Sequence, residues 1–155
     1  MKKVLFLFVV VLAGCSYMDL SLPEEMTVAE ILEEVGKIDY SYDWDSENPH
    51  LEYWQSPTET EELGTGDCED FAIYFMYLAN YYFGWEPELV LVKLSGLGLH
   101  YYAEYDGIIY DWRYQFKVGE HPIEHTEILR YDYDYVMFWA TMGGTRKLTV
   151  SEIDS

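Results

Sequence analysis

The sequence predicts an α+β fold in which helices come first and antiparallel strands follow. Between residues 27 and 84, apolar residues recur at the three- and four-residue spacing of helices. From Glu88 onward, β-branched and aromatic residues alternate with polar ones, as they do in strands. Asp106-Gly107 separates two of these runs and is a favoured two-residue hairpin turn. Helices followed by hairpin-connected strands are typical of α+β domains.

The first two helices are predicted from their capping signals. Thr27 and Glu30 have the Thr-x-x-Glu form of a capping box, so a helix is expected over 27–36. A second capping signal places proline at the first helical position, which predicts a short helix from Pro57 to Leu63.

The third helix is expected to be the centre of the core. Asp67 is a candidate N-cap with Asp70 three residues later, and the segment runs apolar on nearly all sides to Gly84. Between the first two helices, the stretch 37–55 predicts irregular structure with a turn at Asn48-Pro49. Its aromatic residues are expected to pack inward: Tyr40, Tyr42, Trp44, Tyr53 and Trp54.

Four strands are predicted in the second half, at 88–94, 99–105, 108–114 and 133–140. If Asp106 and Gly107 are the two loop residues of the hairpin, Tyr105 pairs with Ile108. His100 and Asp111 then lie on one face as diagonal neighbours. A three-residue loop would move Asp111 to the opposite face.

The N-terminus has the layout of a lipoprotein signal. Lys2 and Lys3 precede a short apolar run, and Leu12-Ala13-Gly14-Cys15 resembles the bacterial lipobox, whose cysteine is acylated and becomes the first residue. A plain secretory signal or a short membrane anchor are alternatives, although the run is shorter than the about 20 residues of a membrane span. The expected organisation is a signal peptide at 1–14, a tether at 15–26, one domain at 27–142 and a tail at 143–155. This describes an exported lipoprotein anchored to a membrane of the bacterial cell envelope.

Acidic residues dominate the chain that processing would leave. When Lys2 and Lys3 are removed from the nine basic residues, seven remain against 29 acidic ones, a formal charge of −22. Nucleic acid is therefore excluded as a partner, and the membrane contact is expected through the N-terminal lipid alone. An acidic surface could attract a cationic substrate, or it could simply be solvated. Cys15 and Cys68 are the only cysteines, so lipidation of Cys15 leaves no disulfide.

Cys68 is the candidate nucleophile, in the motif Gly-Asp-Cys-Glu-Asp-Phe-Ala over 66–72. At the first turn of a helix, backbone N–H groups and the helix dipole stabilise a thiolate, and the amide of Cys68 can bind an oxyanion. The flanking acids disfavour the thiolate, so a cationic imidazole partner is required. His100 is the candidate base, and Asp111 is the candidate carboxylate that orients it. From spacing alone, the alternative is a surface aspartate and a histidine buried among tyrosines.

The motifs together resemble the bacterial transglutaminase-like cysteine peptidases over roughly residues 27–140. The resemblance rests on Trp54-Gln55-Ser56-Pro57, the Gly-Asp-Cys-Glu-Asp core, a histidine opening a strand and an aspartate on the next strand. It implies a papain-like core in which Cys68 is the nucleophile, His100 the general base and acid, and Asp111 the orienting carboxylate.

The resemblance also implies two features around the cysteine. A second oxyanion donor is expected upstream, for which Gln55 and Trp54 are candidates, although packing in the core is the simpler role for Trp54. In some relatives the acids beside the cysteine bind calcium, which corresponds to Asp67 and Glu69. No cofactor is otherwise required, and two carboxylates are few for a cation that takes six to eight oxygens.

Two other patterns are assigned to structure rather than to chemistry. His121 and His125 are four residues apart, but Pro122 disfavours the helix that would bring both onto one metal, so a solvated loop is expected. The many aromatic residues could form a glycan-binding surface, but in strands they more often form core and cross-strand pairs.

The sequence therefore predicts a lipid-anchored cysteine hydrolase that cleaves protein or peptide amide bonds through a thioester. Water resolving the thioester would give a peptidase or amidase, and an amine would give crosslinking. The alternative is a non-catalytic envelope lipoprotein that uses the same fold as a binding module.

Overall fold

The computed structural model describes residues 25–42, 51–114, 121–143 and 145–147. The expected signal peptide with Cys15, the turn at Asn48-Pro49 and most of the expected tail lie outside the described residues. Among the residues described, no helix has both the length and the apolar character needed to cross a membrane.

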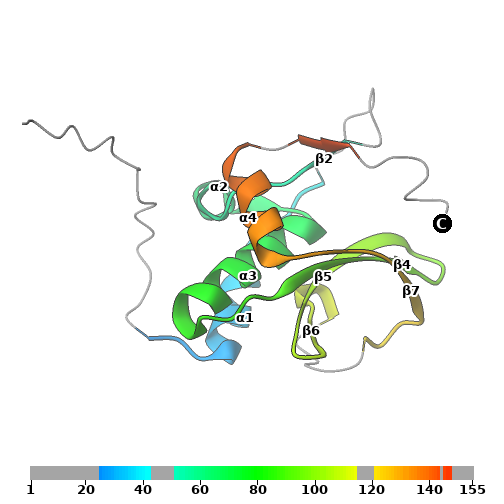
Figure 1. Ribbon diagram of the computed structural model, residues 1–155, viewed down its shortest axis with the longest axis horizontal. Helices are drawn as coiled ribbons and strands as arrows, with labels where there is room; N and C mark the ends of the chain where they lie inside the picture. The colour runs from blue at the N-terminus through cyan, green and yellow to red at the C-terminus, as the bar shows by residue number, and fades with distance from the viewer. Residues whose placement is uncertain (1–24, 43–50, 115–120, 144, 148–155) are drawn as a thin grey trace, which may run out of the picture.

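The three predicted helices are present: α1 (Val28–Val35), α2 (Pro57–Leu63) and α3 (Cys68–Phe83). Thr27 and Glu30 form the complete capping box at the start of α1. Helix α3 runs through the middle of the molecule, with α1 and α2 packed against it and the sheet on its other side (Figure 1). Ten of its residues are buried, which matches the prediction of a central helix that is apolar nearly all round.

A four-stranded antiparallel sheet covers α3, in the order β6-β5-β4-β7. Its strands are β4 (Glu88–Leu94), β5 (Gly98–Tyr105), β6 (Ile108–Tyr110) and β7 (His125–Tyr131). The predicted hairpin register is confirmed, because Tyr105 pairs with Ile108. Asp106 and Gly107 have φ values of 52° and 74°, as a two-residue type I′ turn requires. The strand predicted over 108–114 is too long, since β6 ends at Tyr110 and a 3₁₀ turn, η1 (Trp112–Tyr114), follows.

The strand predicted over 133–140 is wrong, because this segment forms helix α4 (Tyr133–Thr141). Asp132 caps the helix by accepting a hydrogen bond from the backbone N–H of Tyr135 at 2.8 Å. Val136 and Ala140, four residues apart, are both fully buried, which is a helical spacing. The fourth strand of the sheet is instead β7, which directly precedes this helix.

Two short strand pairs lie outside the main sheet. β1 (Asp39–Tyr40) pairs in parallel with β3 (Thr65–Gly66), and β2 (Leu51–Tyr53) pairs with β8 (Thr145–Lys147) from the expected tail. The expectation that the aromatic residues of 37–55 pack inward holds for Trp54 and is wrong for two tyrosines. Tyr40 is 43% exposed and Tyr42 is 60% exposed, because β1 runs at the surface.

The two faces of the sheet bury different sets of side chains. The face toward α3 carries Leu89, Leu91, Tyr101 and Ala103, which join the main core. The opposite face carries a smaller cluster made of Val90, Val92, Leu94 and Tyr102, with Ile123 packed against it. Neighbouring residues of β5 therefore point to opposite sides of the sheet, as the period of a strand requires.

Candidate active site

Cys68 is the first residue of α3, and the motif around it explains this position. Asp70 accepts a hydrogen bond from the backbone N–H of Asp67 at 3.2 Å, which closes the first turn of the helix. A Cβ on Gly66 would lie 2.8 Å from the Cβ of Asp70, so only glycine allows the chain to enter the helix this closely. The sequence Gly-Asp-Cys-Glu-Asp therefore specifies a helix start with the thiol in its first turn.

Two buried carboxylates, Asp67 and Glu69, lie close to the thiol, and a third, Asp70, is buried in the same helix turn. Asp67 is 3% exposed, Glu69 is 1% exposed and Asp70 is fully buried. An Oε2 atom of Glu69 lies 3.3 Å from Sγ of Cys68. Because a carboxylate this close disfavours a thiolate, reactivity at Cys68 needs positive charge nearby.

His100 and Asp111 form a buried hydrogen-bonded pair. The Nε2 atom of His100 lies 2.7 Å from Oδ2 of Asp111, and the two side chains are 1% and 6% exposed. A carboxylate oxygen can only accept here, so Nε2 of His100 carries the proton. In the neutral ring, the lone pair is then on Nδ1, and this is the atom that can take a proton from a thiol.

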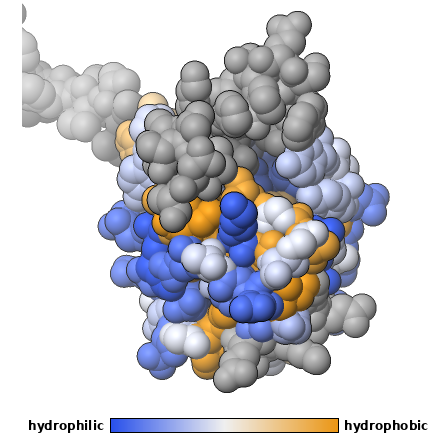
Figure 2. Space-filling model, turned by 90° about the vertical axis from the view of Figure 1, so that its right-hand side faces the viewer, coloured by the Kyte–Doolittle hydropathy of each residue, from blue (hydrophilic) through white to orange (hydrophobic). Residues whose placement is uncertain are grey.

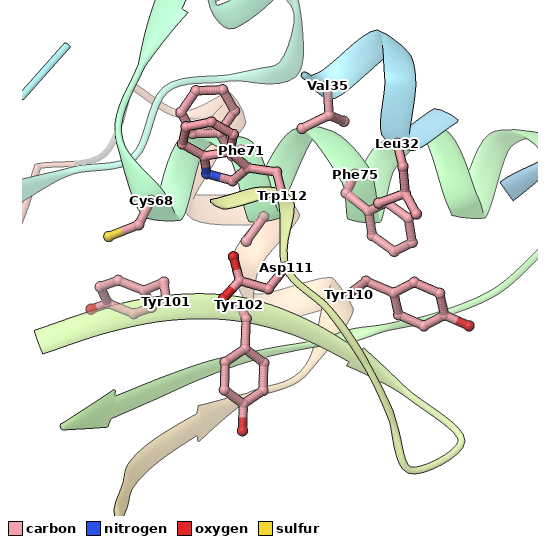
Figure 3. A pocket seen from close by; sticks show the side chains of 11 residues that line it. Leu32, Val35, Cys68, Phe71, Phe75, Tyr101, Tyr102, Tyr110, Asp111 and Trp112 are labelled. Atoms are coloured by element: carbon pink, nitrogen blue, oxygen red, sulfur yellow. The ribbon is translucent and has the colours of Figure 1, made fainter. Parts of the chain in front are cut away.

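Asp111 and Cys68 line the same pocket, between the start of α3 and the hairpin of β5 and β6. Phe71, Tyr101 and Trp112 form part of its wall. Figure 3 shows the thiol at the start of α3 above Tyr101, with the Asp111 carboxylate lining the same pocket. Asp111 thus connects the two parts of the predicted site, because it lines the pocket of Cys68 and is hydrogen-bonded to His100, which is not itself among the residues lining that pocket.

His121 is a site residue that the sequence interpretation missed. A solvated loop was expected, but the His121 side chain is fully buried, and its Nε2 atom lies 3.1 Å from Oδ2 of Asp111. The backbone N–H of Arg113 donates to Oδ1 of Asp111 at 3.0 Å. The prediction failed because a polar loop sequence gives no sign that it folds over the outer face of a sheet.

The two candidate oxyanion residues have different settings. Trp54 is fully buried and packs in the core. Its ring lies edge-on to the rings of Tyr101 and Tyr131, with centroid distances of 6.4 and 5.4 Å. Gln55 is 8% exposed, and its backbone N–H donates to Asp70 at 2.9 Å, which fixes it to the start of α3. The backbone of Gln55 is therefore held at the start of α3, whereas Trp54 packs in the core.

Tyr40 is a second neighbour of the thiol that the sequence did not indicate. Its ring stacks against Phe71 and Trp112, with centroid distances of 6.3 and 6.1 Å, and the guanidinium of Arg113 lies 5.7 Å from its centre. Burial raises the pKa of the Tyr40 phenol, and the nearby Cys68 and Asp67 raise it further. Tyr40 therefore keeps its proton at neutral pH and remains a hydrogen-bond donor beside the site.

Exposed apolar residues lie next to His100 in the sequence. Leu97 is 61% exposed and Leu99 is 38% exposed, in the turn that leads into β5 and at its second residue. Figure 2 shows hydrophobic surface among hydrophilic surface on the side of the molecule where this turn lies. The surface at the start of β5 is therefore apolar in part.

Comparison with solved structures shows the same fold. The calcium-bound form of Legionella pneumophila LapG matches with a TM-score of 0.53 and 17% identity, over 82% of this chain and 75% of LapG. The EGTA-treated form matches with a TM-score of 0.51 and 17% identity, over 72% of this chain and 76% of LapG. A further Legionella pneumophila LapG structure matches with a TM-score of 0.51 and 18% identity, over 67% of this chain and 62% of LapG.

No protein-family model and no curated protein sequence matches the chain. The structural matches show a transglutaminase-like fold, in which Cys68 lies at a helix start, His100 on β5 and Asp111 directly after β6.

Proposed function

We propose that this chain is a cysteine hydrolase that cleaves protein or peptide amide bonds, with Cys68, His100 and Asp111 as its catalytic triad. The observation that carries the proposal is the 2.7 Å contact between His100 and Asp111, since Asp111 also lines the pocket of Cys68. The likeness of the fold to LapG supports this choice of reaction class.

The chemistry follows from the protonation that Asp111 imposes on His100. Nδ1 of His100 takes the proton of the Cys68 thiol, and the thiolate attacks the carbonyl carbon of the amide. The C–N bond then breaks, the leaving amine takes the proton from His100, and a thioester remains on Cys68. Water attacks the thioester, His100 accepts its proton, and the C–S bond breaks to release a carboxylic acid and restore the thiol.

The oxyanion that forms during attack needs donors close to the sulfur. The backbone amide of Cys68 lies in the first turn of α3, where N–H groups point out of the helix end. The side-chain amide of Gln55 is the proposed second donor, because its backbone is fixed to Asp70. Tyr40 keeps its proton and can bind the substrate or the leaving group from the exposed side.

Calcium is proposed to bind beside the thiol, through Asp67 and Glu69. The two residues could supply part of the coordination of this ion, because their carboxylate oxygens lie within 4.8 Å of one another and both side chains are buried, and the remaining ligands would come from other oxygens. Two adjacent buried carboxylates are a charge arrangement that a hard cation stabilises. The ion would supply positive charge next to Cys68 and so offset the acids that disfavour its thiolate.

The reaction class is tested by the rate at which Cys68 is alkylated with iodoacetamide. Catalysis predicts alkylation much faster than that of a model thiol, with a strong decrease in His100→Ala. A Cys68→Ala variant identifies the labelled residue. Slow alkylation that does not depend on His100 would rule out the triad and favour a binding module with the same fold.

Membrane anchoring through Cys15 is a separate proposal. It is supported by the lipobox-like sequence Leu12-Ala13-Gly14-Cys15. In a bacterial host, metabolic labelling with an alkyne fatty acid is expected to mark the full-length chain and to leave Cys15→Ser unlabelled. Equal labelling of both would refute attachment at Cys15, without bearing on the triad.

A further inference from the structure

His121 is a buried imidazole that the proposed triad does not use. Its side chain is fully buried, and its Nε2 atom lies 3.1 Å from Oδ2 of Asp111. This is the same oxygen that lies 2.7 Å from Nε2 of His100. One carboxylate oxygen therefore accepts hydrogen bonds from two imidazoles, whereas a triad needs only one.

His121 donates to Asp111 whether or not its ring is charged. Its Nδ1 atom lies 3.2 Å from the backbone nitrogen of Ile123 and 3.1 Å from the backbone oxygen of the same residue. In the neutral ring, Nδ1 accepts from that N–H, and Nε2 carries the proton. In the charged ring, Nδ1 donates to that oxygen, and Nε2 still carries a proton. The contact with Asp111 is therefore kept in both states.

Packing fixes the His121 ring in this orientation. The ring stacks on the ring of Tyr102, with a centroid distance of 5.9 Å and an interplanar angle of 27°. The ring of His125 lies edge-on to it, with a centroid distance of 5.0 Å. The contacts with Asp111 have the length of hydrogen bonds. Ligand atoms around a tetrahedral zinc ion would lie about 3.3 Å apart, given metal–ligand bonds of about 2.0 Å. The separations of 2.7 and 3.1 Å thus favour a proton network over a metal site.

We infer that His121 is a positioning residue for the triad, an inference that rests on the proposed function. His121 holds Oδ2 of Asp111 while the backbone N–H of Arg113 holds Oδ1, so the plane of the carboxylate is fixed from two sides. The fixed carboxylate keeps the proton of His100 on Nε2 and leaves Nδ1 to serve Cys68. In this role His121 acts through Asp111, with which it shares a hydrogen bond.

The test compares two amide variants of His121 in the rate of Cys68 alkylation as a function of pH. In His121→Gln the amide nitrogen can take the place of Nε2 and still donate to Asp111, whereas in His121→Asn it can replace only Nδ1. Alkylation is expected to slow about tenfold in His121→Asn, equivalent to about 1.4 kcal/mol. It should stay close to the wild-type rate in His121→Gln and in the control His125→Gln.

Two further measurements separate positioning from a general loss of structure. In the background of Asp111→Asn, the change His121→Asn is expected to have no further effect, because both act through one carboxylate. The imidazole N–H proton of His100, observed by NMR, is expected to shift in His121→Asn and to stay in place in His121→Gln.

The outcomes distinguish this inference from the proposed function. If His100→Ala slows alkylation but His121→Asn does not, the role of His121 is refuted and the triad stands. Equal slowing by His121→Asn with and without Asp111 would also refute it. If the wild-type thiol reacts no faster than a model thiol, the proposed function itself fails.

Discussion

The carboxylate of Asp70 binds the backbone N–H of Gln55 at 2.9 Å, across 15 residues of sequence. Its second oxygen binds the N–H of Asp67 at the start of α3. One fully buried side chain thus holds both the helix that carries Cys68 and the strand-to-helix segment that carries the proposed oxyanion donor. The geometry of the site depends on Asp70 although this residue takes no part in the chemistry.

Asp70→Asn is expected to lower both stability and reactivity. The amide offers one neutral oxygen where the carboxylate offers two charged ones, so at least one buried N–H loses its acceptor and neither keeps a charged one. The free energy of unfolding should fall by about 2 kcal/mol. Urea unfolding and alkylation of Cys68 measure the two effects. Asp134→Asn, at an exposed position, is the control and should change stability by less than about 0.5 kcal/mol. A wild-type unfolding midpoint in Asp70→Asn would contradict this role.

Leu97→Ser is expected to weaken substrate binding and to leave the reactivity of Cys68 unchanged. Leu97 is 61% exposed next to β5, so its apolar surface is available to a peptide and contributes little to the fold. Loss of this contact should raise KM several-fold, for about 1 kcal/mol of apolar contact. Peptide cleavage measures KM, and alkylation measures the thiol. Slower alkylation would show that Leu97 supports the triad instead.

Calcium is expected to stabilise the chain through Asp67 and Glu69. At a calcium concentration 100 times the dissociation constant, the gain is about 2.7 kcal/mol. Thermal unfolding with calcium and with EGTA measures it, and Asp67→Asn combined with Glu69→Gln should abolish the difference. A calcium effect that persists in this double variant would place the ion elsewhere.

Alkaline unfolding is expected to depend on Tyr102. Burial raises the pKa of Tyr102 to about 12, from an ordinary value of 10.0, and Glu104 adds to this effect. Because the folded state favours the neutral phenol, its contribution to stability is complete below pH 10 and is lost as pH rises toward 12. Tyr102→Phe should therefore make the midpoint of urea unfolding less sensitive to pH over this range. Tyr81→Phe, at a tyrosine that is 60% exposed, should leave that sensitivity unchanged.

The parts of the fold that local chemistry determines could be predicted from the sequence. Capping residues and turn residues act within a few positions, so helices α1 to α3 and the hairpin at Asp106-Gly107 were placed correctly. The hairpin register then brought His100 and Asp111 together. Helix α4 was mistaken for a strand because its aromatic and β-branched residues suit both structures, and only packing against α3 decides between them.

The site was predictable where it depends on the hairpin and not where it depends on tertiary packing. Cys68 and the pair of His100 and Asp111 follow from the helix start and the strand register. Tyr40 and His121 reach the site because β1 joins β3 and because the residues before β7 cover the outer face of the sheet. Neither arrangement leaves a local pattern in the sequence.

Helix α3 is enclosed by α1, α2, α4 and the sheet, and most of its length is buried. Local fraying therefore cannot move the thiol out of its setting without opening the whole core. Amide hydrogens in the middle of α3 should exchange as slowly as those at the centre of β4. The proposed nucleophile is thus carried by the buried central helix, while the exposed Leu97 and Leu99 lie in a surface segment that can change without disturbing it.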